Sequence, residues 1–524
     1  MSERLQRPTE EHAASPYDRR IRTIAIVGGG TAGWLAASIL ARALPGTGTS
    51  LSLIESAEIG TVGVGEATIP PIIDLLRFLN IDEADFIRHT QATYKLGIRF
   101  SDWRRIGESY WHPFGTFGAP INRRPFFHSW NKARSEGLNL AFNSFSLCAT
   151  LGDAGQFQFP DTRPDTVASG LKYALHFDAT LVAKYLRAYA ERLGVMRLER
   201  TVAGATQGPA GEINALLFAD NSALTADLYL DCSGFRGLLI EQALGTGYVP
   251  WTDLLPCDRA VAFATPVMQP RPPYTESRAR DAGWQWRIPL QHRVGNGYVY
   301  SSAHCTDEQA HADLASMVGV APEAEPRFLR FTTGRRKAFW NRNCVALGLS
   351  SGFLEPLEST SIHLIVSGIF HLLDHFPDRD FDRSNIDSYN EELIVETERI
   401  RDFIALHYCL TQRDDTALWR DCRAMALPDS LRERIERYRG TGRVRPRAGE
   451  LFTDLSWFYI FEGMGVVPER GDPLLNVIDP AQFRKILSTL SQATEAAAKI
   501  GQPHDSFFLG TNGRSVESVG TARG

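Results

Sequence analysis

The stretch that decides the fold is Ile26-Val27-Gly28-Gly29-Gly30-Thr31-Ala32-Gly33. The apolar run over residues 23–27 predicts a strand that leads into this turn, and residues 34–44 predict a helix that follows it. Residues 51–55 predict a second strand, which ends at Glu55, an acid about 20 residues beyond the last glycine. Strand, glycine turn, helix, strand and acid form the fingerprint of a dinucleotide-binding fold, with the pyrophosphate at the turn and a ribose at the acid.

Further strands of the same sheet are expected much later in the chain. Residues 226–231 run into Cys232-Ser233-Gly234, and residues 343–349 run into Ser350-Ser351-Gly352, so both segments read as strands that deliver small residues to a cofactor. The intervening segments must then be insertions that hold the substrate. The helical pattern of residues 362–375, 386–406 and 481–500 predicts a C-terminal third that consists mostly of helices.

These patterns predict an α/β fold with two main parts. The first is a discontinuous Rossmann-like cofactor domain over residues 21–380, with inserted segments that face the substrate. The second is a mainly helical substrate-binding part over residues 381–507. We expect a disordered N-terminal segment at residues 1–20 and a mobile tail at residues 508–524, which is rich in glycine and serine.

Composition excludes several classes of function. The 524 residues carry a formal net charge of −5, so no overall field favours nucleic acid or an anionic membrane. The seven cysteines never form C-x-x-C, so neither a disulfide framework nor a metal site is expected. Residues 1–20 are polar and no apolar run approaches the ~20 residues of a membrane span, so we expect a soluble cytoplasmic protein. The arginine-dense residues 432–447 favour a solvated helix face, with an anionic-ligand patch as the alternative.

Four motifs resemble those of the flavin-dependent tryptophan halogenase family and occur in that family's order over residues 21–500. They are Gly63-Val64-Gly65-Glu66-Ala67-Thr68-Ile69-Pro70, Tyr94-Lys95-Leu96-Gly97-Ile98, Gly283-Trp284-Gln285-Trp286-Arg287-Ile288-Pro289 (W-x-W-x-I-P) and Glu355-Pro356-Leu357-Glu358-Ser359-Thr360. The last two are far more specific than a glycine turn. The resemblance implies FAD as the cofactor and a domain similar to that of flavoprotein monooxygenases.

The resemblance also implies a two-component reaction. A separate NAD(P)H-dependent flavin reductase supplies FADH2, and O2 adds at the flavin C4a to give a hydroperoxide. A halide ion, bromide or chloride, attacks the terminal oxygen, and the resulting hypohalous acid travels inside the protein to a substrate held elsewhere.

The family's cofactor and halide contacts transfer to named positions of this chain. Backbone amides at Thr360 and Ser361 would hold the halide beside the flavin, although many members have glycine where this chain has Ser361. Serine and threonine before an apolar helix are also ordinary caps, so that alternative stays open. The implied FAD contacts are Gly28, Gly30, Thr31, Ala32, Gly33, Glu55, Gly65, Ala67, Val202 and Leu349.

Lys95 and Glu358 are the implied catalytic residues. In the family the matching lysine either hydrogen-bonds the hypohalous acid or forms a haloamine, and a buried lysine suits both because its lowered pKa makes the neutral amine accessible. The carboxylate of Glu358 would stabilise the cationic ring intermediate and help remove the ring proton. The alternatives are a strand lysine that extends its amine to solvent, and a carboxylate favoured by a helix dipole.

The two tryptophans of the W-x-W-x-I-P segment have an implied role in exclusion. Trp284 and Trp286 would lie beside the flavin and keep the substrate away from it, which suppresses direct monooxygenation. By composition alone they could equally be packed core aromatics.

The substrate itself is expected to be aromatic but not free tryptophan. His112 and Phe114 match a family position where the substrate ring packs. Members that take free tryptophan clamp its amino and carboxylate groups with a longer, tyrosine-rich segment. Here that segment is short and offers Arg447, Glu450 and Phe452 with no tyrosine pair, which favours an indole, a phenol or a larger aromatic in a more open site. Bromide is favoured over chloride by analogy with open-site members.

Two other functions remain compatible with parts of the pattern. An aromatic flavoprotein monooxygenase would share the fold but leaves Lys95, Glu358 and the tryptophan segment unexplained. A catalytically inactive FAD-binding sensor would be expected to lack Lys95 or Glu358, and both are present. The sequence does not decide the oligomeric state, and a homodimer is compatible with it.

Overall fold

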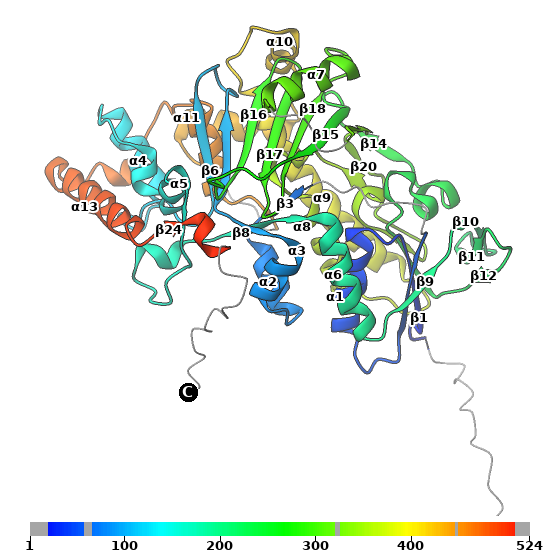
Figure 1. Cartoon of the computed structure of the whole chain (residues 1–524). Helices are drawn as coiled ribbons and strands as arrows, with labels where there is room; N and C mark the ends of the chain where they lie inside the picture. Colours follow the sequence, from blue (N-terminus) through cyan, green and yellow to red (C-terminus); the bar gives the residue numbers. More distant parts are fainter. Residues whose placement is uncertain (1–18, 57–64, 320–324, 446–448, 509–524) are drawn as a thin grey trace, which may run out of the picture.

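The computed structural model describes residues 19–56, 65–319, 325–445 and 449–508 (Figure 1). Most of the N-terminal segment and of the tail, together with Gly63, Val64 and Arg447, lie outside the described residues. Arg20 forms a β-bridge with Asp378, and Phe508 is buried, so both ends of the described chain belong to ordered structure and not to a disordered segment or mobile tail.

The cofactor domain is built on a six-stranded sheet in the order β21-β22-β13-β1-β2-β9. Its five parallel strands come from distant parts of the chain, which confirms the expected discontinuous α/β architecture. The predicted strand over 343–349 shortens to three residues because the chain turns into a 3-10 helix at Gly348–Ser350. The strands are β1 (Thr23–Val27), β2 (Ser50–Glu55), β9 (Met196–Glu199), β13 (Leu228–Asp231) and β22 (Cys344–Ala346), with β21 (Trp340–Asn341) antiparallel at the edge.

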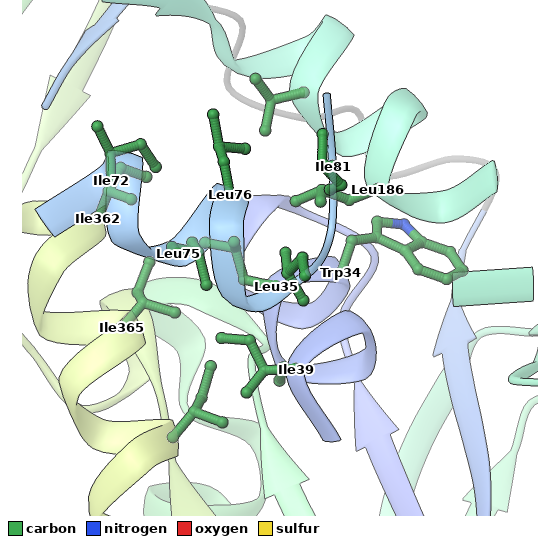
Figure 2. Packing of buried hydrophobic residues seen from close by; sticks show 14 of the residues in the cluster. Trp34, Leu35, Ile39, Ile72, Leu75, Leu76, Ile81, Leu186, Ile362 and Ile365 are labelled. Carbon is green, nitrogen blue, oxygen red and sulfur yellow. The ribbon is translucent and has the colours of Figure 1, made fainter. Parts of the chain in front are cut away.

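Apolar helix faces cover this sheet and form the first core. Helix α1 (Thr31–Ala43) packs against α6 (Ala179–Arg192) and α8 (Ser361–Asp374), and α2 (Pro71–Phe78) lies beside them. Figure 2 shows the cluster: Leu35 and Ile39 of α1 lie among Leu75 and Leu76 of α2 and Ile365 of α8. Trp34 lies at the other side of the cluster, near Leu186 of α6. Their helical spacing places each set on one face, so burial of these faces fixes the helices that begin at the glycine turn and at Ser361.

A second sheet has the order β19-β15-β18-β17-β16-β5-β6 and carries the W-x-W-x-I-P segment as β17 (Gly283–Pro289). A small sheet, β3-β8-β4, lies next to it. The alternating run around Lys95 is divided between the two sheets at Leu96: β4 (Thr93–Lys95) pairs with β8 (Ala174–Asp178), whereas β5 (Gly97–Ser101) pairs with β6 (Ser109–Pro113). Gly97 permits this step, since a Cβ there would lie 2.7 Å from the carbonyl oxygen of His112.

The C-terminal third is helical, as predicted, and forms a second core with the large sheet. The predicted helices are α8, α9 (Arg383–Cys409) and α13 (Pro480–Ala498), with ends displaced by a few residues. The arginine-dense segment lies largely on α11 (Asp429–Thr441). The interpretation of this segment as a solvated face is wrong for Arg434, which is buried and pairs with Glu450.

Among the remaining strands, β10-β11-β12, β14-β20-β23 and β24-β7 form small sheets of their own. In Figure 1, α13 and α4 lie at one end of the molecule and β10 to β12 at the other. Among the described residues, no helix is both long and apolar enough to cross a membrane. The further strands are β3 (Gly65–Ala67), β7 (Gln156–Phe157), β10 (Val202–Gln207), β11 (Ile213–Phe218), β12 (Ala223–Leu224), β14 (Tyr248–Pro250), β15 (Arg259–Thr265), β16 (Thr275–Arg280), β18 (Val294–Tyr300), β19 (Arg327–Arg330), β20 (Gly334–Arg336), β23 (Gly352–Phe353) and β24 (Gln502–Pro503). The further helices are α3 (Glu83–Thr90), α4 (Phe126–Ser135), α5 (Leu147–Asp153), α7 (Asp307–Val318), α10 (Ala417–Ala424) and α12 (Asp454–Gly463).

Candidate active site

A cavity of about 580 Å³ lies at the carboxyl ends of the parallel strands. Its wall includes all the predicted FAD contacts except Gly33, namely Gly28, Gly30, Thr31, Ala32, Glu55, Gly65, Ala67, Val202 and Leu349. Cys232, Ser233 and Gly234 line it as well, as expected for small residues at the end of β13. The strands thus bring together at one edge residues that lie more than 300 positions apart in the sequence.

The glycine turn has the shape that a dinucleotide needs. A Cβ on Gly28 would lie 2.2 Å from the carbonyl oxygen of Cys232, and one on Gly33 would lie 1.8 Å from the carbonyl oxygen of Gly28. A Cβ built on Gly30 would have no described atom within 4 Å, and no described side chain caps the N-terminus of α1 there. The residues therefore fit FAD: the free amide end of α1 and the open space suit a pyrophosphate, and Gly33 contributes by letting the helix approach the turn.

The cavity wall includes two carboxyl groups, those of Glu55 and Glu66. Glu55, the expected ribose acceptor, forms an ion pair with Arg197 and lies 3.7 Å from Arg187. Glu66, which sequence reasoning did not single out, lines the cavity next to Gly65, and burial raises the pKa of its carboxyl to about 7. The signal that could have identified Glu66 is its position between Gly65 and Ala67, two predicted FAD contacts of the same motif.

Lys95 is buried at the end of β4 and does not reach solvent, which excludes the interpretation of a solvent-directed strand lysine. Its Nζ donates hydrogen bonds to the carbonyl oxygen of Thr68 (2.9 Å) and to Ser359 Oγ (2.8 Å), and it lies 5.4 Å from the centre of the Phe114 ring. Burial lowers the pKa of Lys95 to about 7 against the opposing effect of the nearby Glu358 carboxylate. Both the ammonium and the neutral amine are therefore accessible near neutral pH.

Glu358 is held as a buried carboxylate by two histidines. His112 Nδ1 donates to Glu358 Oε2 (2.8 Å), and His407 Nε2 donates to Glu358 Oε1 (2.8 Å). Burial acts to raise the pKa of Glu358, but the interactions with His112 and His407 outweigh it and lower this pKa to about 2. Burial lowers the pKa of His407 against the opposing effect of Glu358, and its Nδ1 accepts a hydrogen bond from the Tyr110 hydroxyl (2.7 Å).

His407 and Tyr110 were missed by sequence reasoning, and their neighbour Tyr408 was missed too. Tyr408 donates to Glu355 Oε2 (2.6 Å), the first glutamate of the motif at residues 355–360, called EPLEST below. The consecutive α9 residues His407 and Tyr408 thus hold the two glutamates of this turn. The His-Tyr pair within a long apolar helix pattern was the available signal, because buried polar side chains require partners.

The tryptophan pair divides between two environments. Trp286 lines the cavity and packs over Gly297, where a Cβ would lie 2.0 Å from its ring. Trp284 is not part of the cavity wall; it donates from Nε1 to Glu355 Oε2 (2.7 Å). Burial raises the pKa of Glu355 to about 7 despite these hydrogen bonds from Tyr408 and Trp284. Of the two, only Trp286 lies where it can limit access to the cavity.

The turn before α8 connects the cavity to the buried pair of Lys95 and Glu358. Ser359 adopts a left-handed conformation (φ 59°), and Ser361, the first residue of α8, lines the cavity. Thr360 is the N-cap but makes no side-chain cap hydrogen bond, and its buried Oγ1 has no hydrogen-bond partner among the described residues. The interpretation of this segment as an ordinary side-chain cap is therefore wrong, and the α8 amides have no side-chain acceptor at the cap.

Aromatic rings surround the other side of Lys95 and Glu358. Phe452 stacks on Phe403 with ring centres 3.7 Å apart. The ring of Tyr459 lies 5.8 Å from that of His112, and its buried hydroxyl has no hydrogen-bond partner in the part of the chain that the structure describes. The side chain of Glu450 is only 4% exposed and accepts hydrogen bonds from Arg399 (3.1 Å) and from Arg434. Its carboxylate is thus already neutralised by two guanidinium groups.

Comparisons with known proteins identify the family of this site. A family model described as tryptophan halogenase matches residues 23–480. Tryptophan 6-halogenase SttH from Streptomyces toxytricini is 37% identical, with 91% of this chain and 98% of that protein covered. Two solved structures are similar: Xcc4156, a flavin-dependent halogenase from Xanthomonas campestris (43% identity, TM-score 0.90, 93% and 98% covered), and BrvH, a flavin-dependent halogenase from Brevundimonas sp. BAL3 (42% identity, TM-score 0.91, 94% and 100% covered).

These matches cover nearly the whole of each chain and agree with the cavity, the glycine turn and the EPLEST turn. The chain belongs to the tryptophan halogenase family and is a flavin-dependent halogenase.

Proposed function

We propose that this enzyme halogenates an indole, a phenol or a larger aromatic compound and not free tryptophan. The observation that carries the proposal is the state of Glu450. A free amino acid brings an ammonium group that needs a carboxylate, and the carboxylate of Glu450 is buried and paired with Arg399 and Arg434. Binding the ammonium there would require breaking a buried ion pair, which is strongly unfavourable.

In this proposal the oxidant forms at the cavity, on one side of the EPLEST turn, and the substrate reacts at Lys95 and Glu358, on the other side. Bound reduced FAD, with O2 and a halide, supplies hypohalous acid, and a separate NAD(P)H-dependent reductase supplies the reduced flavin. Residues 21–380 would form the cofactor part and residues 381–507 the substrate part. Backbone amides at Thr360 and Ser361 would hold the halide at the cavity, and Trp286, with Trp284 behind it, would keep the substrate out.

At the other end of the turn, Lys95 would activate the hypohalous acid. It acts either as an ammonium that donates a hydrogen bond to the departing hydroxyl oxygen or as an amine that accepts the halogen. The ring carbon of the substrate then takes the halogen, and the carboxylate of Glu358 stabilises the cationic ring and accepts its proton. His112 and Phe114 would pack against the ring. The contact between Lys95 and Ser359 supports this arrangement, since Ser359 directly precedes Thr360, where the halide would bind.

Free tryptophan is the second candidate, because SttH is named as a tryptophan 6-halogenase. A competition assay separates the two. The enzyme, with FAD, NADH, a flavin reductase and O2, would receive an equimolar mixture of indole, a phenol and L-tryptophan, with bromide and chloride in competition.

We expect brominated indole or phenol to dominate by at least tenfold in product, roughly the effect of 1.4 kcal/mol in transition-state binding. Halogenated tryptophan as the main product would refute the substrate proposal. A hydroxylated product in the absence of halide would instead indicate a monooxygenase, and FAD binding by titration serves as the control for intact protein.

A further inference from the structure

A row of polar side chains runs along the contact between α8 and α9. His363, Ser367, His371 and His375 repeat every fourth residue of α8 and therefore share one helix face. At one end of the row, Glu396 of α9 accepts hydrogen bonds from His363 Nε2 (3.0 Å) and Ser367 Oγ (2.6 Å) and is satisfied. At the other end His371 and His375 face Glu392, and no hydrogen bond between these histidines and Glu392 is formed there.

There, one atom from each of His371, His375 and Glu392 lies within 4.8 Å of the other two. His371 Nδ1 is 2.7 Å from Glu392 Oε2 but makes no hydrogen bond, because the ring nitrogen and the oxygen are not aligned for one. His375 Nε2 is 3.9 Å from Glu392 Oε1, beyond hydrogen-bond range. Three potential ligand atoms thus converge without satisfying one another.

The hydrogen bond of His375 Nδ1 fixes the tautomer in which Nε2 carries the lone pair that a metal ion would need. Its Nδ1 donates to the carbonyl oxygen of His371 (2.9 Å), which leaves the lone pair on Nε2 as an acceptor or a metal ligand. Metal-binding histidines commonly donate their second ring N–H to a carbonyl or carboxylate in this way. Ser388 Oγ donates a hydrogen bond to the same Nε2 (3.1 Å), so a metal ion would replace the serine proton at this nitrogen.

We propose that His371, His375 and Glu392 bind one divalent transition-metal ion, with Zn²⁺ as the representative. Two histidines one helical turn apart and a carboxylate from a neighbouring helix supply the imidazole and oxygen ligands that Zn²⁺ accepts. Bonds of about 2.0–2.2 Å require ligand atoms roughly 3.3 Å apart. Rotations of the two imidazole rings and of the Glu392 side chain, which is 47% exposed, would provide that adjustment.

The proposed site is independent of the halogenation chemistry. The sequence, which lacks C-x-x-C, predicted no metal site, and this proposal departs from that prediction. The ion would join the last turn of α8 to α9 across the connecting residues 375–382. Helix α8 begins at Ser361 and α9 carries His407, so the ion would fix the relative position of the two helices that supply both ends of the reaction site.

Calorimetric titration of tag-free, chelator-treated protein with Zn²⁺ tests the proposal. We expect one ion per chain and an affinity that falls at least about 100-fold in His371→Ala, His375→Ala and Glu392→Gln, above the ~10–100-fold effect of losing an outer partner. His89→Ala is the matched control, since His89 lies 3.3 Å from the Asp85 carboxylate but has no second histidine beside it. Glu392→Gln keeps the assay valid if a histidine variant fails to fold, because Glu392 is largely exposed.

Two further measurements decide the outcome. Co²⁺ bound at the site should give a visible spectrum without thiolate charge-transfer bands, and Zn²⁺ should slow amide exchange in residues 371–392 of the wild type but not of Glu392→Gln. Zinc binding that is unchanged in all three variants, thiolate bands, or no binding by the wild type would each overturn the proposal.

Discussion

Replacing Lys95 by methionine should make the protein more stable while abolishing halogenation. Lys95 is fully buried, and burial lowers the pKa of its amine from 10.5 to about 7. At about pH 7 this shift corresponds to roughly 5 kcal/mol of unfavourable free energy, at 1.36 kcal/mol for each pKa unit. Methionine has a similar length and removes this penalty, but it leaves the acceptors on Thr68 and Ser359 unpaired, at about 1 kcal/mol each. The net expectation is a gain of about 3 kcal/mol at neutral pH.

The pH dependence of this gain is the sharper part of the prediction. Between about pH 7 and 10.5 the folded protein holds Lys95 neutral while the unfolded chain keeps it protonated. The unfolded state then binds more protons, so the stability of the wild type rises with pH in this window. By roughly pH 9 the remaining penalty is only about 2 kcal/mol, and the advantage of the methionine variant should vanish.

Urea titrations of the FAD-free proteins at the two pH values, followed by tryptophan fluorescence, measure the effect. Lys184→Met, on the exposed face of α6, is the control and should show no such pH dependence. A methionine variant that is less stable than the wild type at neutral pH, or a difference that stays constant between the two pH values, would refute the reasoning. In the same variant halogenated product should disappear while a small-molecule trap still detects hypohalous acid; unchanged bromination would remove Lys95 from the mechanism.

Two other substitutions test the cofactor turn and the carboxylate. Gly33→Ala should abolish FAD binding and lower the melting temperature, because its Cβ would lie 1.8 Å from the Gly28 carbonyl oxygen. The control is Gly440→Ala, whose Cβ would have no described atom within 4 Å, and it should leave FAD binding and the melting temperature intact. Equal FAD affinity in the two variants would contradict this prediction. His407→Gln should lower kcat by roughly 10- to 100-fold with little change in KM, since His407 positions Glu358. The pKa of Glu358 is lowered to about 2, and its charge is lost as pH falls through that value. Loss of His407 should raise this pKa and move the acid limb of the pH–rate profile to higher pH. An unmoved limb would show that His407 does not act through Glu358.

The sequence by itself determined the features that depend on local spacing. The strand, turn and helix around Gly28 to Gly33 follow from short-range rules, since only glycine permits the close approaches seen there. The same is true of the later strands, of α8, α9 and α13, and of the EPLEST turn beside α8. Periodicity and turn chemistry act over a few residues, so they can be read without knowing the rest of the fold.

Only the tertiary structure decided which polar groups meet. Lys95 bonds Ser359 across 264 positions and His112 bonds Glu358 across 246, and nothing local in either segment encodes these pairings. The roles of His407, Tyr408 and Glu66 also remained hidden, and Glu450 proved to be paired with arginines instead of available to a substrate. The physical reason is that a buried charge must find its partner wherever packing brings one, and packing is a property of the whole chain.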